Sequence, residues 1–196
     1  MNKETNLEEK PSTKMKIKAY VPEIRTIVLV MMGLMVAVQF ILERVASIDT
    51  PVTRLSFTFV GRAVTGSILG PVYSALVGIA ADLLGCFYKG YTINPVITFA
   101  AAFRGVTFGL CLFRKQTVVR MIVAAFLDQF VAGLVITTIG LFWLGGVPFA
   151  WQTVLARLVQ SAVIFAVELA FLLLTRNNLF PQIKKFMSVM NESDSI

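Results

Sequence analysis

Long apolar segments separated by short polar connections fill the chain between residues 26 and 174. A helix of roughly 20 apolar residues crosses the hydrocarbon core of a bilayer, so this pattern predicts membrane-spanning helices. Gly70-Pro71 is a turn signal and divides one of the longer segments, leaving a short span before it that we expect to be tilted or bent. Six spans are predicted in all. They cover residues 26–42, 57–69, 72–87, 96–113, 121–144 and 149–174.

The composition agrees with a membrane protein. Hydrophobic residues make up 57% of the chain, charged residues 15%, and the mean hydropathy is +0.78, whereas soluble domains average about 25% charged residues. The predicted fold class is therefore an all-α integral membrane protein. The net charge of +7 does not indicate a nucleic-acid partner, because the Lys and Arg residues stand at the ends of apolar segments. The partner that they indicate is the lipid bilayer.

Lys and Arg are distributed unequally between the two sides of the predicted bundle. One side holds the polar segment before the first span, the connection 114–120 and the segment after the last span, whereas the other side holds Arg44, Arg54 and Lys89. An excess of Lys and Arg in short connections marks the cytoplasmic side, so both termini are expected in the cytoplasm. The predicted division is a retained cytoplasmic tail at 1–25, a membrane substrate-binding domain at 26–175 and a second cytoplasmic tail at 176–196.

Six charged residues interrupt the apolar segments. They are Arg62, Asp82, Arg104, Asp128, Arg157 and Glu168. Charges within a bilayer face a protein interior or a watery cavity. An arginine that faces a cavity can hold an anion through paired N–H donors, in a geometry that lysine does not reproduce. The alternative is that each arginine pairs with one of the three acids and does nothing else. The sequence leaves both interpretations open.

The candidate substrate-binding residues combine these arginines with side chains at the outer ends of the spans, which are polar except for Phe57. The outer group is Arg54, Ser56, Phe57, Asn94 and Thr98, and the deeper group is Arg62, Arg104 and Arg157. No catalytic residue, metal site or cofactor is predicted. The chain has no histidine, and Cys86 and Cys111 lack the spacing of metal ligands. An intramembrane enzyme is therefore disfavoured.

The chain also lacks a phosphate-binding loop for a nucleotide. Gly61 and Gly66 have the glycine spacing of such a loop, but Ser67-Ile68 follows them where the motif requires a lysine. Energy for transport would have to come from elsewhere.

Gly33 and Ala37 lie four residues apart in the first span and so share one helix face. Small residues at this spacing let another helix approach closely. The helix that approaches could belong to this chain or to a partner.

Residues 43–110 carry a family resemblance. The sequence ERVASIDTPVTRLSFTFVGRAVTGSILGPVYSALVGIAADLLG, followed by YTINPVITFAAAFRGVTFGL, resembles the folate family of substrate-binding S components of energy-coupling factor (ECF) transporters. The similarity continues weakly through LFWLGGVPF and ARLVQ. Three elements make the resemblance specific when they occur together. They are the run 54–59, the Gly70-Pro71 turn with Gly78 and Asp82 after it, and the run 95–98 followed by Gly105 and Gly109.

This resemblance implies a six-helix protein of the bacterial cell membrane that captures a vitamin from outside. The partner is then an ECF module of one transmembrane coupling subunit and two ATPases. Members of the family dock to the coupling subunit through small residues spaced by four on the first helix, and Gly33 and Ala37 match that pattern.

The chain departs from the family at three places. It has Gly61 in place of a proline, Arg62 in place of an apolar residue, and Pro-Val-Ile-Thr at 95–98 in place of Pro-Gly-Phe-Thr. Folate is the first expectation, and pantothenate is the nearest competitor because an added guanidinium suits any carboxylate-bearing vitamin. Positively charged thiamine would be repelled. A self-contained secondary transporter remains the other alternative, although the two halves of the chain show no obvious repeat.

Overall fold

The computed structural model describes residues 26–44, 47–49, 54–90, 92–113, 116–143 and 151–193, with backbone only at 44, 47–49, 54–56 and most positions after 176. Within these ranges, five helical segments are long and apolar enough to cross a membrane. They are α2 (Thr26–Arg44), α3 (Thr58–Lys89), α4 (Pro95–Leu112), the continuous stretch Val118–Trp143, and α7 (Trp151–Ser193). The expected helical membrane architecture is confirmed, although the count differs from six.

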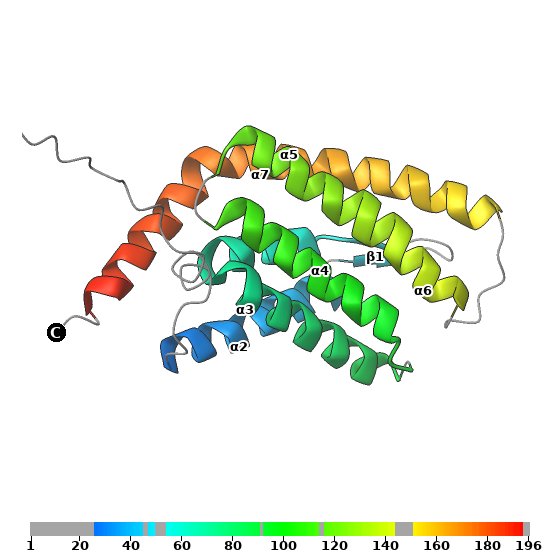
Figure 1. Ribbon diagram of the computed structural model, residues 1–196, viewed down its shortest axis with the longest axis horizontal. Coiled ribbons are helices and arrows are strands. Elements are labelled where there is room, and N and C mark those ends of the chain that lie inside the picture. Colours follow the sequence, from blue (N-terminus) through cyan, green and yellow to red (C-terminus); the bar gives the residue numbers. More distant parts are fainter. Residues whose placement is uncertain are drawn as a thin grey trace, which may run out of the picture.

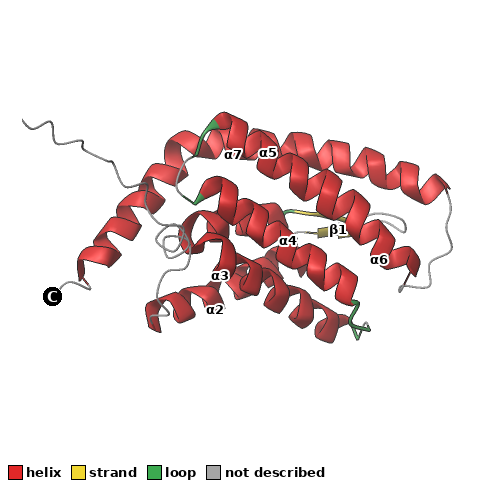
Figure 2. Cartoon of the chain, viewed as in Figure 1, coloured by secondary structure: helices red, strands yellow, loops and turns green. Residues whose placement is uncertain are grey.

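Two short strands are the exception to the helical architecture of the described residues (Figure 2). β1 (Ser47–Asp49) pairs antiparallel with β2 (Arg54–Ser56), so that Asp49 stands opposite Arg54 in the backbone register. The polar connection expected to lack a helix thus forms a hairpin between α2 and α3.

The predicted turn at Gly70-Pro71 lies inside α3, where the two predicted spans form one helical element. Gly70 has φ 80° and ψ −176°, a backbone conformation that glycine adopts without steric cost. A straight helix would place Gly61 and Tyr88 about 40 Å apart. Instead, Gly61 packs on Gln39 of α2, and Tyr88 packs on the next residue, Phe40, with ring centroids 5.6 Å apart.

Since these two α2 residues are neighbours, α3 folds back on itself at Gly70. Its two arms, 58–69 and 71–89, run in opposite directions in Figure 1. We call them the first and second arms of α3.

α4 packs directly against the second arm of α3. A Cβ atom at Gly105 would collide with the carbonyl oxygen of Ser74, and one at Gly109 would collide with the backbone of Pro71. At Gly78 the carbonyl oxygen of Ala101 would lie 2.7 Å away. The glycines that carry the family resemblance therefore serve this close helix pair.

The fifth apolar segment is not a uniform α-helix. It consists of α5 (Val118–Phe126), the π-helix η1 (Leu127–Ile136) and α6 (Thr137–Trp143). The hydroxyl of Thr137 donates to the carbonyl of Ala132, five residues earlier, at 2.8 Å. π-Helical turns are rare and often mark functional sites. This one contributes Asp128 and Gln129, both buried.

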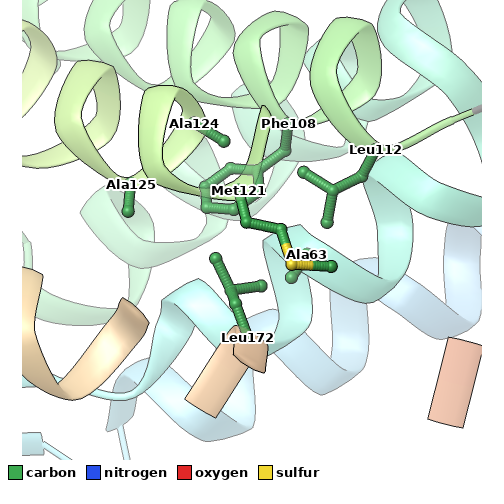
Figure 3. Packing of buried hydrophobic residues seen from close by; sticks show 7 residues of the cluster. All are labelled: Ala63, Phe108, Leu112, Met121, Ala124, Ala125 and Leu172. Atoms are coloured by element: carbon green, nitrogen blue, oxygen red, sulfur yellow. The ribbon is translucent and has the colours of Figure 1, made fainter. Parts of the chain in front are cut away.

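The apolar core fills one end of the bundle. Its seven buried side chains come from the first arm of α3, α4, α5 and α7 (Figure 3): Ala63, Phe108, Leu112, Met121, Ala124, Ala125 and Leu172. In Figure 1 the start of α2, the end of α4 and the start of α5 lie at this end. The strands, the start of α4 and the start of α7 lie at the opposite end.

Candidate functional site

A cavity of about 410 Å³ lies between the helices, in the half of the bundle away from the apolar core. Both arms of α3 and all the other spanning segments contribute to its wall. Its polar lining residues include Gln39, Glu43, Thr58, Arg62, Asp82, Thr92, Asn94, Arg104, Gln129, Thr137, Arg157, Gln160 and Ser161. Small-molecule sites have volumes of roughly 300–1,000 Å³, so the cavity is of a suitable size for a small ligand.

Asp128 is the centre of the charge network beside this cavity. Its Oδ2 lies 2.9 Å from Nη2 of Arg62, and its Oδ1 lies 3.7 Å from Nε of Arg104. The second distance is too long for a hydrogen bond, so Arg104 contributes by charge alone. The Asp128 side chain is fully buried. Two of the three arginines predicted within the spans therefore share one carboxylate.

Gln129 joins the two buried acids. Its Nε2 donates to Oδ2 of Asp128 at 3.0 Å and to Oε2 of Glu168 at 2.6 Å. Glu168 is 0% exposed, and its Oε1 has no hydrogen-bond partner among the described residues. An amide nitrogen has two protons, so one glutamine serves both carboxylates.

Hydroxyl groups hold the guanidinium groups of Arg62 and Arg104. Nη1 of Arg62 donates to Thr58 at 3.0 Å, and Nη2 of Arg104 donates to Thr137 at 3.4 Å. Both arginines are thus fixed by partners from this chain, which matches the ion-pair interpretation of the sequence for these two residues.

Arg157 differs from the other two arginines. It lines the cavity from α7, and its buried Nε, like those of Arg62 and Arg104, has no hydrogen-bond partner among the described residues. The difference lies in ion pairing. No ion pair joins it to any residue that the structure describes. Its charge is therefore not neutralised by a neighbouring acid in the described part of the chain.

Asn94 and Thr98 lie at the start of α4, next to the cavity. Asn94 caps α4, since its Oδ1 accepts from the backbone N–H of Val96 at 3.1 Å and its Nδ2 donates to the carbonyl of Gly140 at 2.8 Å. The Thr98 hydroxyl lies 2.8 Å from Oδ2 of Asp82, closer than the carbonyl of Asn94 at 3.2 Å. Asp82 lines the cavity, whereas Thr98 stands behind it.

The family model described as "ECF transporter, substrate-specific component" matches residues 28–181. The chain belongs to this family. The resemblance found in residues 43–110 is thereby confirmed, and the protein is a multi-pass membrane protein of a transporter family.

Individual relatives of this substrate-specific component are folate transporters. The folate transporter FolT of Clostridium novyi (strain NT) is 31% identical over 144 residues, which cover 72% of this chain and 83% of the relative. The folate transporter FolT of Leuconostoc mesenteroides subsp. mesenteroides is 24% identical over 170 residues, covering 80% of this chain and 88% of the relative. A crystal structure of FolT bound with folic acid superposes with a TM-score of 0.72 at 25% identity, covering 79% of this chain and 95% of that chain.

The structure brings only part of the predicted site of this substrate-specific component together. Arg62, Asn94, Arg104 and Arg157 line the cavity, but Phe57 is exposed and does not. Arg54 and Ser56 belong to β2, and their side chains lie outside the described residues.

Several cavity residues were missed by the sequence analysis. Gln39, Gln129 and Gln160 all line the cavity. A polar amide within an apolar segment is costly in lipid, and this cost was the available signal for them. The sequence-based prediction rests on charged side chains and leaves out the amide side chains of these glutamines.

The face of α2 that carries Gly33 and Ala37 is exposed. Nothing described lies within 4 Å of the position that a Cβ atom of Gly33 would take. Leu29, Val30 and Leu34 around it are 57% to 65% exposed. No helix among the described residues packs there, so this face is open to lipid or to a partner.

Proposed function

We propose that this substrate-specific component captures folate from outside the cell for uptake by an ECF-type transporter. The observation that carries the proposal is Arg157, a guanidinium in the cavity wall without an acidic partner among the described residues. An intramembrane charge of this kind is a functional site by default. The glutamate tail of folate carries carboxylates, and the relatives described above are folate transporters.

Arginine suits a carboxylate ligand because its planar N–H donors match the two oxygens. A charge-assisted hydrogen bond of this kind contributes about 1.5 to 3 kcal/mol. Arg62 and Arg104 already face Asp128. Their role in the proposal is to hold the wall of the cavity.

The proposed topology has six crossings with both termini in the cytoplasm of a bacterial cell. The fold-back of α3 at Gly70 supports six crossings, because each arm then crosses separately. The basic connection 114–120 follows α4 at the end of the bundle that holds the apolar core, which supports a cytoplasmic position for that end. The cavity then faces outward, and 1–25 and 176–196 are cytoplasmic tails flanking the membrane domain 26–175.

Energy is proposed to come from a separate ECF module, with one coupling subunit and two ATPases. The sequence contains no phosphate loop of its own. Gly33 and Ala37 form the proposed docking face, which is supported by their exposure and by the apolar residues around them.

The deciding experiment is to purify the protein from its host and identify the co-purifying small molecule by mass spectrometry. Folate in the sample, together with saturable binding of added folate to ligand-free protein, is the expected result. Pantothenate in its place would overturn the proposal in favour of another carboxylate vitamin. Transport by the isolated chain in vesicles, without any ATPase, would favour a secondary transporter.

A further inference from the structure

Asp82 is the second cavity charge that lacks an opposite charge beside it. It lies on the second arm of α3 and lines the cavity. Its contact within the described residues is the Thr98 hydroxyl, which donates to Oδ2 at 2.8 Å. No described basic side chain forms an ion pair with it. A carboxylate placed in a membrane domain without a cation requires another explanation.

The other acids near the cavity do not offer such a free carboxylate. Asp128 is occupied by Arg62, Arg104 and Gln129. Glu168 is completely buried and does not line the cavity. Glu43 lines the cavity but already interacts with another group. Asp82 has a second oxygen, Oδ1, that accepts no hydrogen bond from the described residues.

Small residues make up most of the wall beside Asp82. Gly78, Ala81, Gly85 and Cys86 line the cavity on the same arm of α3, within about one helical turn of Asp82, and Ala101 lines it from α4. Cys86 has the largest of these side chains, and it is no larger than a single thiol group on Cβ. We infer that this wall leaves room for a flat ring beside the carboxylate.

Asp82 and Arg157 bind different kinds of ligand group, because a carboxylate accepts hydrogen bonds and a guanidinium donates them. They lie on different helices, α3 and α7, and do not form an ion pair with each other. A ligand that satisfies both must have a donor edge at one place and a carboxylate at another. The pterin ring of folate has such an edge, since its 2-amino group and the adjacent ring N–H are parallel donors that match two carboxylate oxygens.

We propose that Asp82, positioned by Thr98, binds the 2-amino edge of the pterin ring while Arg157 binds a carboxylate of the glutamate tail. This inference rests on the proposed function and adds the orientation of the substrate. Asp82 is the specificity residue for the ring, and Thr98 is a positioning residue. Pantothenate has a carboxylate and single hydroxyl and amide donors but no pair of parallel N–H donors, so it cannot match both oxygens of Asp82 and binds with lower affinity.

The test pairs two variants with two altered ligands, using the purified full chain in detergent. The ligands are folate, a folate analogue whose 2-amino group is replaced by methyl, and the folate bis-amide. Asp82→Asn is expected to weaken folate binding roughly 10- to 100-fold. It should weaken binding of the methyl analogue by a smaller factor, because that analogue keeps only the ring N–H. Arg157→Gln is expected to weaken folate binding by a similar factor while leaving the affinity for the bis-amide unchanged.

Thr98→Val is the positioning control. It removes the hydroxyl that holds Asp82 and keeps the carboxylate, so it should weaken folate binding less than Asp82→Asn does, and weaken binding of the methyl analogue less than it weakens binding of folate. An Asp82→Asn variant that loses folate and methyl analogue in the same proportion would show a purely structural role and overturn the inference.

Wild-type protein decides the question if Asp82→Asn does not fold. The inference requires wild type to bind folate much more tightly than the methyl analogue, and equal affinities would overturn it. Wild type that binds no folate at all would overturn the proposed function itself, so the two failures are distinguishable.

Discussion

Arg62 and Asp128, 66 positions apart in the sequence, meet through a 2.9 Å hydrogen bond between Nη2 and Oδ2. The pair joins the first arm of α3 to the π-helix η1, next to the cavity. Its side chains are 12% and 0% exposed, respectively. The contact therefore fixes the position of two walls of the site at once.

Arg62→Gln should destabilise the protein whether or not ligand is present. Removing one partner of a buried ion pair leaves the other charge uncompensated and costs about 3 to 5 kcal/mol. Because Gln129 and Arg104 remain near Asp128, we expect the lower end of this range. Thermal unfolding in detergent without ligand measures the effect. An unchanged melting temperature would mean that the pair contributes nothing to stability.

The double variant Arg62→Gln, Asp128→Asn tests the same pair from the other side. It removes both charges, so its melting temperature should recover part of the loss seen in Arg62→Gln alone. Additive losses would indicate that the two residues act independently.

Arg157→Gln should behave in the opposite way. No ion pair to a described residue is lost, so the melting temperature without ligand should change little. Folate binding should weaken by about 1.5 to 3 kcal/mol. Calorimetric titration gives this value, and Arg120→Gln is the matched control because Arg120 is exposed outside the cavity. Equal affinities in all three proteins would remove Arg157 from the site.

Gly105→Ala should destabilise the α3–α4 pair. The new methyl group would collide with the carbonyl oxygen of Ser74, which is backbone and cannot rotate away. Overpacking typically costs about 1 to 3 kcal/mol. Gly33→Ala is the matched control, since nothing described lies within 4 Å of its Cβ position and Ala is the better helix former by about 1 kcal/mol. Melting curves that rank Gly105→Ala at or above Gly33→Ala would contradict the close packing.

Gly33→Leu should separate folate binding from folate uptake. The isolated protein should bind folate normally, because the exposed face of α2 lies outside the cavity. Uptake of labelled folate by cells that express the ECF module should be lost, because a bulky side chain prevents close helix approach. Gly33→Ala, which keeps a small residue, should transport. Normal uptake by Gly33→Leu would exclude this face as the docking site.

The sequence was informative wherever one residue type has a single physical interpretation. The turn at Gly70 was predictable from the Gly-Pro pair, which is a turn signal. Glycine then adopts the positive φ that the structure shows at this position. Arg62, Arg104 and Arg157 are expected beside a polar space because lipid excludes charged groups, and all three line the cavity. Their partners were not predictable, since the pairing of Arg62 with Asp128 depends on how α3 folds back and on the path of η1.

Other features left no local signal. The π-helix η1 has the same apolar composition as an α-helix, and the difference lies in hydrogen bonds that tertiary packing selects. The hairpin of β1 and β2 is formed by strands of three residues, too short to show an alternating pattern. The sequence marks Asp82 as a possible partner for an arginine and as part of the family resemblance, whereas its hydrogen bond with Thr98 depends on the packing of α3 against α4.

The apolar cluster of Ala63, Phe108, Leu112, Met121 and Leu172 closes the bundle at the end away from the cavity. These side chains are at most 1% exposed and come from four different helices. A ligand in the cavity therefore has buried apolar packing between it and that end of the bundle. Opening that end would expose apolar surface from every one of those helices simultaneously. A bundle built in this way cannot conduct as a channel does. On the proposed function, a ligand held in the cavity can leave toward that end only when the helices that carry this cluster rearrange.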